Sequence, residues 1–349
     1  MLEDKNFSKT PIASLGEFGL IDRLIEPFTI KNESSENSIG DDCAIINPLG
    51  KKIVISTDFL TEGVHFNLGY VPLKHLGYKS VVVNISDIAA MNATPTQILV
   101  SIAVSNRFPV EALEEIYAGI KLACDRYSID LVGGDTASSN AGLVINITAI
   151  GLANDEEIVK RAGAKVNDLV VVTGDLGAAY LGLQILEREH SVFLANPNMQ
   201  PEMEGYDYIL ERQLKPEART DVKKSLEDLG ITPTSMIDIS DGLASEILHV
   251  SKQSKVGFRI YEDRIPMDSL TVTTAEELNL NPIVCAMNGG EDYELLMTVS
   301  PNDFEKIKNH PDFTIIGHVV DEQQGNFLVL KGSQELSQIT AQGWNVFGD

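Results

Sequence analysis

Apolar positions along this chain follow two spacings, short runs typical of β-strands and longer stretches with helical periodicity. The first clear run, residues 53–56, predicts a strand that delivers Thr57 and Asp58 at its exit. Runs of this kind alternate with helical stretches through most of the chain. The alternation predicts an α/β fold.

Residues 72–92 fit a helix, because Pro72 suits a first helical position and Asn92 is tolerated just past a helix end. The three valines at 81–83 also allow a strand, since β-branched residues favour one. Under either interpretation Asp87 is embedded in apolar sequence.

The alternation continues beyond this point. Residues 111–127 read as an amphipathic helix, and the apolar pair 131–132 runs into Gly133-Gly134-Asp135. A strand is predicted over 143–152.

A polar, glycine-bearing segment at 154–168 predicts a domain boundary, which divides the chain into 1–152 and 153–349. After the boundary we expect a strand at 169–173 and a helix at 178–189.

A second strand of this half is predicted over 236–240, with Asp238 and Ser240 on one face. Asp241-Gly242 then opens a helix at 243–252. Two α/β halves that each present Asp-rich strand ends predict a functional site between them.

Two polar segments interrupt these elements. Residues 30–38 are predicted to be too polar to pack. They form either a lid that orders on ligand binding or a plain surface loop. Residues 195–205 lack periodicity and are expected to form a surface excursion without a chemical role.

The charge balance restricts the class of partner. The 349 residues carry 51 acidic and 27 basic side chains, a formal net charge of -24, without a Lys/Arg cluster. Nucleic acids and anionic membrane surfaces are therefore poor partners, and phosphorylated ligands need a metal to bind. Most of the surplus acidic residues merely keep a surface soluble.

The three cysteines form no CxxC pair, which argues against a disulfide framework or a zinc site. Residues 1–10 lack the apolar core of a signal peptide, and no apolar stretch approaches the roughly 20 residues of a membrane helix. We expect a soluble, cytoplasmic protein.

Candidate chemistry comes from carboxylates that lie beside glycine, serine or threonine. Carboxylate and hydroxyl oxygens are ligands for hard cations such as Mg²⁺. Six segments carry this combination: Gly40-Asp41-Asp42, Ser56-Thr57-Asp58, Asn84-Ile85-Ser86-Asp87, Gly133-Gly134-Asp135-Thr136, Asp238-Ile239-Ser240-Asp241-Gly242 and Gly289-Gly290-Glu291-Asp292.

Motifs for other chemistries are missing from the sequence. It contains no P-loop, no G-x-G-x-x-G opening a helix after a strand, no G-x-S-x-G and no H-E-x-x-H. Carboxylates repel triphosphate, by about 4 kcal/mol for two unit charges about 4 Å apart at an effective dielectric of about 20. Divalent cations reverse that sign, so an acidic site of this kind is suited to metal-assisted phosphoryl transfer.

These motifs, with the stretch Gly63-Val64-His65-Phe66 and the run GGEDYEL at 289–295, resemble the thiamine-monophosphate kinase family of the aminoimidazole ribonucleotide synthetase-like superfamily. The match covers nearly the whole chain. The resemblance implies ATP-dependent phosphorylation of thiamine monophosphate to thiamine diphosphate by direct in-line transfer with several Mg²⁺ ions. It also implies a homodimer whose N-terminal sheets form a shared β-barrel, a mixed-sheet C-terminal domain, and a site between the two domains.

Site residues follow from the resemblance by matching position. The implied metal ligands are Asp42, Ser56, Thr57, Asp58, Asp87, Asp135, Asp238 and Asp241. The implied nucleotide contacts are Gly134, Asp135, Arg161 and Ser240, and the implied substrate contacts are His65, Glu291 and Trp344. No side chain is assigned as a catalytic base.

Each of the less specific residues has a plain structural alternative. A lone histidine such as His65 is more often structural, and Trp344 is nearly as well explained as a core anchor. Glu291 also fits a turn residue beside two glycines, and Arg161 a solvated loop cation. The segment 215–219 resembles a family segment but carries no assigned chemistry, and no adenine pocket is identified.

Two alternative functions stay open at this point. One is a superfamily sibling, such as an ATP-dependent ring-closing synthetase or a maturation factor. The other is a non-enzymatic acidic protein that binds divalent cations.

Overall fold

The computed structural model describes residues 10–35, 44–140 and 142–341. The chain forms two compact units, the first comprising residues 1–84 and 95–151 and the second 85–94 and 152–349. The chain passes from one unit to the other three times, and the first passage lies inside a helix. Each unit has its own sheet, so the fold is mixed α/β with two sheets.

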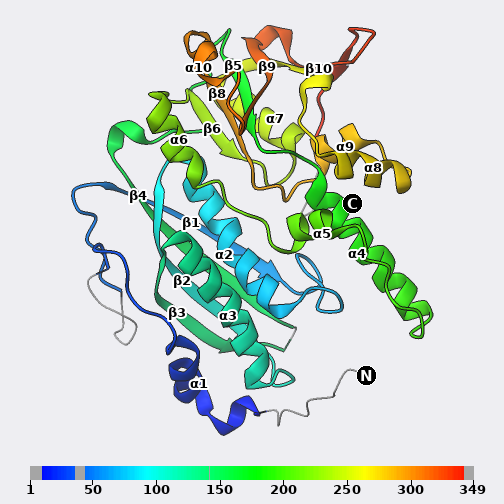
Figure 1. Ribbon diagram of the computed structural model, residues 1–349. Helices are drawn as coiled ribbons and strands as arrows, with labels where there is room; N and C mark the ends of the chain where they lie inside the picture. The colour runs from blue at the N-terminus through cyan, green and yellow to red at the C-terminus, as the bar shows by residue number, and fades with distance from the viewer. Residues whose placement is uncertain (1–9, 36–43, 141, 342–349) are drawn as a thin grey trace. The chain divides into compact units, whose positions relative to one another are not determined.

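The first unit is built on a four-stranded sheet with the order β1-β4-β2-β3. Helices α2 and α3 lie over one face of this sheet (Figure 1). The elements are α1 (Gly16–Ile25), β1 (Lys52–Thr61), α2 (Leu73–Ala90), β2 (Thr94–Val104), α3 (Val110–Tyr127), β3 (Asp130–Ser138) and β4 (Val144–Ala153), with a 3₁₀ turn at Ile12–Ser14.

Helix α2 confirms the helical interpretation of this stretch. It is buried on nearly all sides from Leu76 to Ser86, which explains why its sequence lacks a polar stripe and resembles a strand at the three valines. Asn92 follows the helix with a left-handed backbone, φ 56°. The predicted helix at 111–127 is also confirmed, as α3.

Two predicted strand ends are wrong in this unit. Strand β1 continues to Thr61, so Thr57 and Asp58 lie within it rather than at its exit. Gly133-Gly134-Asp135 likewise lies inside β3. Asp and Gly are depleted in strand interiors, and both segments are tolerated here because β1 and β3 are the edge strands of the sheet.

The segment after α1 packs more tightly than its polarity predicts. Asp130 is buried at the start of β3, and its carboxylate accepts hydrogen bonds from the Lys31 and Asn32 backbone N–H groups at 2.6 and 2.9 Å and from Ser35 Oγ at 2.7 Å. Gln97 Nε2 donates to Ser34 Oγ at 2.6 Å. The expectation that residues 30–38 are too polar to pack is thus wrong for 31–35, because one buried carboxylate and one buried amide satisfy the polar groups. Residues 36–38 lie outside the described residues.

The second unit is built on a seven-stranded mixed sheet with the order β11-β10-β7-β9-β5-β8-β6. Only the β10–β7 pairing is parallel. Its strands are β5 (Leu169–Thr173), β6 (Ser235–Asp238), β7 (Val256–Tyr261), β8 (Leu295–Val299), β9 (Phe313–Asp321), β10 (Asn326–Val329) and β11 (Leu336–Gln338). Its helices are α4 (Ala178–Ala195), α5 (Asp207–Leu214), α6 (Asp221–Leu229), α7 (Leu243–Ser254), α8 (Ser269–Glu277), α9 (Pro282–Asn288) and α10 (Phe304–Ile307), with 3₁₀ turns at Asp155–Glu157, Glu262–Arg264, Pro301–Asp303 and Glu322–Gln324.

Alternate strand residues of this sheet face two different apolar clusters. Helix α7 covers one face, where Ile247 packs with Ile237 and Leu296. Helices α6 and α10 cover the other, where Leu226 packs with Met236. Burial on both faces explains why these strands read as continuous apolar runs rather than alternating ones.

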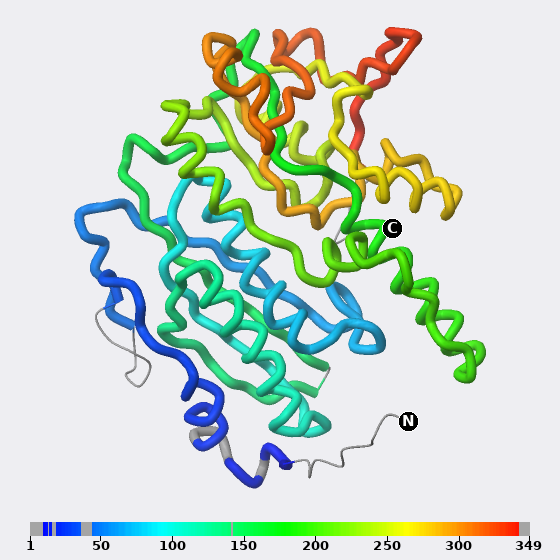
Figure 2. Tube along the Cα trace, in the orientation of Figure 1, coloured from blue at the N-terminus to red at the C-terminus, as the bar shows by residue number. Residues whose placement is uncertain are grey.

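Helix α4 runs six residues further than predicted and lies side by side with α5 (Figure 2). The predicted strand at 236–240 ends at Asp238, so Ser240 lies in the following turn and not on the strand face of Asp238. The helix that opens after Asp241-Gly242 is confirmed as α7. Residues 196–206 form an irregular connection without helix or strand, in agreement with the predicted surface excursion.

Candidate functional site

Asp238 is the last residue of β6 and is only 3% exposed. The last residues of α2, from Ile85 on, belong to the second unit. Among them, Ser86 Oγ donates a hydrogen bond to Asp238 Oδ2 at 2.7 Å. Burial raises the pKa of Asp238 well above its ordinary value, and the nearby charge of Asp87 raises it further. Two predicted metal ligands, Asp87 and Asp238, are therefore neighbours.

Asp241 and Ser240 lie in the turn between β6 and α7. The Asp241 backbone N–H donates to Glu246 Oε1 at 3.1 Å, and Glu246 is 3% exposed. Burial raises the pKa of Glu246 to about 8, and the charges of Asp238 and Asp241 add to the effect. Sequence reasoning missed Glu246, although an acidic residue in the first turn of a helix was a visible signal.

The glycine-rich turn at 289–294 runs beside this aspartate turn. The Glu291 N–H donates to Ser240 O at 2.7 Å and the Tyr293 N–H to Ile239 O at 2.9 Å. In return the Ile239 N–H donates to Glu294 O at 2.7 Å. The predicted substrate residue Glu291 is thus bonded directly to the segment that carries the predicted metal and nucleotide residues.

Arg161 is exposed in the loop before β5. Its charge lowers the pKa of both Asp238 and Glu246, although burial outweighs this effect. Ser254, at the end of α7, holds the loop by donating to Arg161 O at 3.2 Å and accepting from the Gly163 N–H at 3.0 Å. A guanidinium held near these carboxylates is suited to contact a phosphate.

The segment 215–219, which had no assigned chemistry, contributes a buried ion pair. Arg219 Nη1 lies 2.8 Å from Glu294 Oε2, and Arg212 Nη1 lies 3.1 Å from Glu294 Oε1. Thr173 Oγ1 donates to the same carboxylate at 2.6 Å. Sequence reasoning missed these partners because ion pairs between distant segments leave no local pattern.

In the first unit, Ser56 and Asp58 share one face of β1 and Thr57 points to the other, because side chains alternate along a strand. Asn84 Oδ1 accepts from the Asp58 N–H at 2.9 Å. Thr57 Oγ1 donates to Ile147 O at 3.1 Å and accepts from Asn146 Nδ2 at 3.0 Å. The structure therefore separates the Thr57 hydroxyl from Asp58, and Thr57 as a metal ligand stays a prediction.

Gly134 and Asp135 lie on β3, with Asp135 exposed and paired with Ser101 of β2. A register shift precedes them in the pairing with β2, and a Cβ on Gly134 would lie 1.9 Å from Val100 O, so only glycine fits there. Strands β1 and β3 form opposite edges of the sheet, so Asp58 and Asp135 are separated by three strand spacings, about 14 Å.

His65 follows β1 in a tight turn and is exposed. Its Nδ1 accepts a hydrogen bond from the Thr61 N–H at 3.1 Å, which leaves the ring proton on Nε2 when the ring is neutral. Asp42 and Trp344 lie outside the described residues, and their roles stay predictions.

The donor set fits Mg²⁺. Every candidate ligand offers oxygen. Burial and the nearby charge of Asp87 both disfavour the ionised form of Asp238, and a divalent cation would compensate for this cost. Within the ranges that the structure describes, no group of three or more His, Cys, Asp or Glu side chains is arranged to hold a metal. Magnesium in phosphoryl-transfer sites takes only one or two carboxylates and completes its shell with water and phosphate oxygens.

Comparison with known proteins identifies the family. Residues 40–153 match the AIR synthase related protein, N-terminal domain, and residues 165–329 match the corresponding C-terminal domain. A thiamine-monophosphate kinase of Bacillus subtilis (strain 168) is 34% identical over 339 residues, which cover 95% of this chain and 100% of that relative. The chain belongs to the thiamine-monophosphate kinase family. A member from Aquifex aeolicus (strain VF5) is 33% identical over 96% of this chain and 99% of its own length.

Solved structures of thiamine-monophosphate kinases share the fold. The crystal structure from Stenotrophomonas maltophilia K279a has a TM-score of 0.75 at 26% identity and covers 92% of this chain and 98% of that one. The structure described as AaThiL complexed with AMPPCP and TMP has a TM-score of 0.72 at 31% identity and covers 98% of this chain and 100% of that one. E. coli HypE, a hydrogenase maturation protein, is 20% identical with a TM-score of 0.71, which shows a common fold alone.

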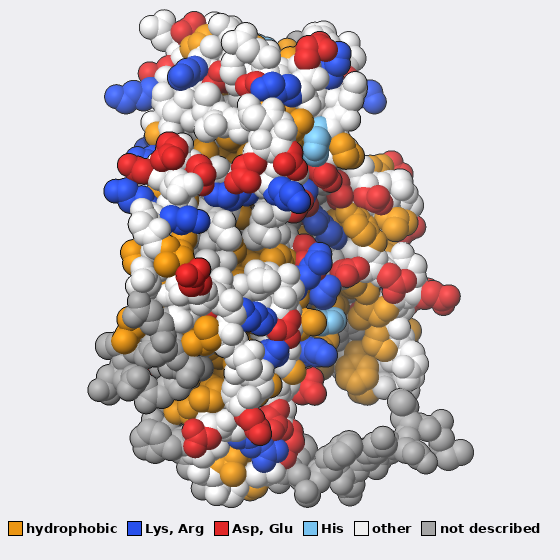
Figure 3. All heavy atoms as spheres, turned by 60° about the vertical axis from the view of Figure 1, so that its left-hand side comes forward, with side chains coloured by type: hydrophobic (Ala, Val, Ile, Leu, Met, Phe, Trp, Pro, Cys, Tyr) orange, Lys and Arg blue, Asp and Glu red, His pale blue; other side chains and the backbone are white. Residues whose placement is uncertain are grey.

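On the face shown in Figure 3, basic side chains are scattered among acidic ones and form no continuous basic patch. Among the residues that the structure describes, no helix combines the length and apolar character needed to cross a bilayer.

Proposed function

We propose that this protein transfers the γ-phosphoryl group of ATP to the phosphate of thiamine monophosphate, which yields thiamine diphosphate and ADP. One phosphate oxygen of thiamine monophosphate forms the new bond to phosphorus, and the bond from that phosphorus to the β-phosphate bridging oxygen breaks. The observation that carries the proposal is the 2.7 Å hydrogen bond between the Glu291 N–H and Ser240 O, because it joins the two motifs that hold the implied substrate and nucleotide residues. Full-length similarity to thiamine-monophosphate kinases supports the same reaction.

We further propose that Mg²⁺ binds at Asp87, Asp238 and Asp241, at Ser56 and Asp58, at Thr57, at Asp135, and at Asp42. Bound Mg²⁺ would supply charge neutralisation for the phosphates. Asp58 and Asp135 lie on opposite edge strands of the sheet, which supports more than one ion. Glycine 134, Arg161 and Ser240 would contact the nucleotide, and His65, Glu291 and Trp344 the thiamine substrate.

No protein base is required in this proposal. The attacking phosphate oxygen is already anionic near neutral pH, so the chain's own residues orient the two substrates and exclude water. Arg161 would bind phosphate, and Glu291 would bind the ring system of the substrate.

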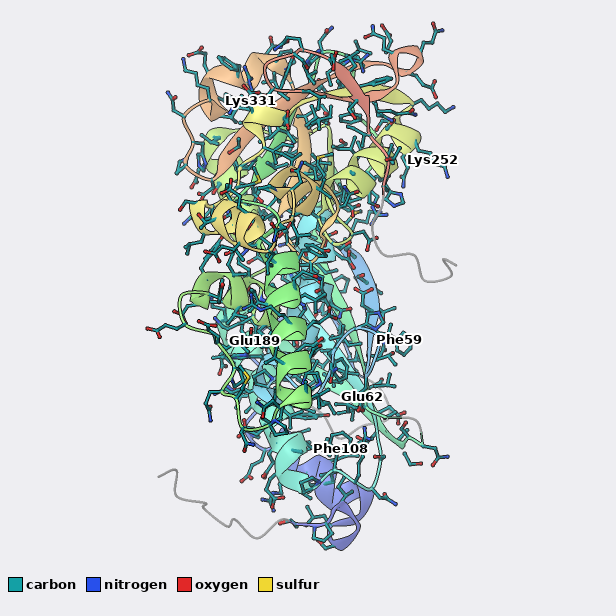
Figure 4. The ribbon with its side chains drawn as sticks, turned by 90° about the vertical axis from the view of Figure 1, so that its right-hand side faces the viewer. Phe59, Glu62, Phe108, Glu189, Lys252 and Lys331 are labelled. Atoms are coloured by element: carbon teal, nitrogen blue, oxygen red, sulfur yellow. The ribbon has the colours of Figure 1, made fainter. Side chains whose placement is uncertain are left out.

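The proposed assembly is a homodimer in which the four-stranded sheets of two copies form a shared barrel. On β1, Ile53, Ile55 and Phe59 alternate along the strand and are 46%, 63% and 61% exposed. Figure 4 labels Phe59 on this strand. An apolar edge strand of this kind is a template for pairing and a liability when left exposed, which supports burial against a second copy. The proposed partners are otherwise small molecules in the cytoplasm.

The test is a steady-state assay with purified protein, ATP and Mg²⁺, in which ADP release is coupled to absorbance and thiamine diphosphate is identified by chromatography. We expect turnover with thiamine monophosphate and little with thiamine, formylglycinamidine ribonucleotide or selenide. Asp238→Asn should lose at least about 100-fold in kcat. Asp228→Asn, on the exposed side of α6, is the matched control and should be unaffected. Turnover with another acceptor in place of thiamine monophosphate would refute the proposal.

A further inference from the structure

Helix α5 contacts the 289–294 turn through two adjacent side chains. Gln213 Nε2 donates to Glu291 Oε2 at 2.8 Å, and Gln213 is 6% exposed. Arg212 pairs with Glu294 and also donates from Nη2 to Asp292 O at 3.4 Å. One helix therefore contacts three residues, Glu291, Asp292 and Glu294, of the turn that carries the proposed substrate carboxylate.

The backbone of this turn is strained and firmly held. Gly290, Glu291 and Tyr293 all have left-handed φ angles, 72°, 58° and 52°. For Glu291 and Tyr293 this conformation costs about 1–2 kcal/mol each, and such strain concentrates at functional sites. The hydrogen bonds from Glu291 and Tyr293 to the 239–240 backbone hold it in place. Because the main chain is fixed, the hydrogen bond from Gln213 restricts the direction of the Glu291 carboxylate.

The partner is itself fixed by close helix packing. Gly182 of α4 faces α5, where an added Cβ would lie 2.4 Å from Ile209 O and 2.7 Å from Gln213 Cβ. Only glycine allows this approach, so the contact between α4 and α5 sets the position of Gln213. A buried amide at a fixed position is suited to orient a carboxylate through a directional hydrogen bond.

The orientation of a carboxylate matters more when it accepts a hydrogen bond than when it only compensates a positive charge. A carboxylate that opposes a cationic ring needs proximity but no particular rotation, whereas one that accepts an N–H must place a lone pair on the donor. The aminopyrimidine ring of the proposed substrate offers such an N–H. Gln213 donates to one carboxylate oxygen of Glu291 and so restricts the rotation of that carboxylate.

We propose that Gln213 is a positioning residue that aims the Glu291 carboxylate at the exocyclic amino group of the substrate's pyrimidine ring and thereby sets selectivity for an amino over an oxo substituent. This inference rests on the proposed function, because it takes thiamine monophosphate as the substrate. Nothing in it requires Gln213 to touch the ligand.

The hydrogen-bond inventory of the two side chains makes a reversal experiment possible. In Glu291→Gln, the two amides can hydrogen-bond in either direction, because Gln213 offers both a donor and an acceptor. When Gln213 still donates, the new NH₂ group is directed at the ligand and favours an acceptor there, so the variant no longer favours a donor alone. In Gln213→Glu combined with Glu291→Gln, the new carboxylate accepts from that NH₂ group, so the carbonyl is directed at the ligand and again favours a donor.

The experiment measures kcat/KM for thiamine monophosphate and for its 4-oxo analogue with wild type, Glu291→Gln and the double variant. We expect wild type to prefer the amino substrate by about tenfold or more, Glu291→Gln to lose most of that preference, and the double variant to prefer the amino substrate again. Gln213→Leu should raise KM for thiamine monophosphate about tenfold and leave KM for ATP unchanged. Glu211→Gln, an exposed position on the same helix, should match wild type in every value.

The outcomes separate the two proposals. Wild type that fails to phosphorylate thiamine monophosphate overturns the proposed function and this inference with it. Wild type that is active, with the same preference in Glu291→Gln and in the double variant, overturns only the role of Gln213. A Gln213→Leu variant whose KM rises equally for both substrates would also overturn it, because that result indicates general damage to the site.

Discussion

Glutamate 246 provides the sharpest stability test of the acidic cluster around Asp238. The side chain is 3% exposed, and burial raises its pKa from an ordinary 4.5 to about 8. A carboxyl whose pKa is higher in the folded than in the unfolded state destabilises the fold as pH rises between those two values. The gap corresponds to about 5 kcal/mol as an upper limit, at about 1.4 kcal/mol for each pH unit.

Glu246→Gln removes this titration and keeps the carbonyl acceptor for the Asp241 N–H. In metal-free protein we expect the variant and wild type to differ by less than about 1 kcal/mol near pH 5, and the variant to be more stable by up to about 4–5 kcal/mol near pH 8.5. Relaxation around the carboxylate will reduce the gain. Addition of Mg²⁺ should narrow the gap, because a cation at Asp238 and Asp241 compensates the nearby charge.

The assay is urea unfolding in EDTA, followed by circular dichroism at several pH values from about 5 to about 8.5. Glu227→Gln on α6, where the side chain is 54% exposed, is the control and should show no pH-dependent gain. Parallel stability curves for Glu246→Gln and wild type over this range would refute the reasoning, because they would mean that Glu246 ionises as easily in the folded protein as in the unfolded chain.

Further predictions address the other parts of the account. Asp135→Asn should lower kcat by at least about 100-fold. The melting temperature should stay nearly unchanged because the side chain is exposed, and normal activity would contradict a role for Asp135 in the site. Asp130→Asn should destabilise the protein by about 3 kcal/mol in urea unfolding, because the new amide faces donors that the carboxylate satisfied, and a change below about 0.5 kcal/mol would contradict that role. Ile55→Glu should shift the protein towards a monomer in multi-angle light scattering, whereas a dimer of unchanged stability would place the interface elsewhere.

Much of the architecture could be predicted from local pattern. Helices α2 and α3 were predicted within two residues at each end, and β5 at its exact bounds, because apolar periodicity and end signals coincide there. The extents of β1 and β3 were wrong because polar residues at sheet edges resemble strand ends. Edge position depends on strand order, which no local pattern reveals.

Site residues that act through distant partners were the hardest to predict. The motif containing Asp238 and Ser240 was visible, but its hydrogen bond from Ser86 joins residues 152 positions apart. Gln213 and Arg219 carry no motif of their own, because their roles depend on where α5 and the following loop meet the 289–294 turn. The family resemblance supplied residue identities, and the structure added which of them are bonded to one another.

The central claim is that Mg²⁺ allows a strongly acidic protein to bind two phosphorylated substrates. Isothermal titration with a non-hydrolysable ATP analogue, in Mg²⁺ and again in EDTA, tests it most directly. The account predicts affinity at least about 100-fold weaker in EDTA, with a circular dichroism spectrum that shows the protein still folded. Equal affinity in the two conditions would contradict it.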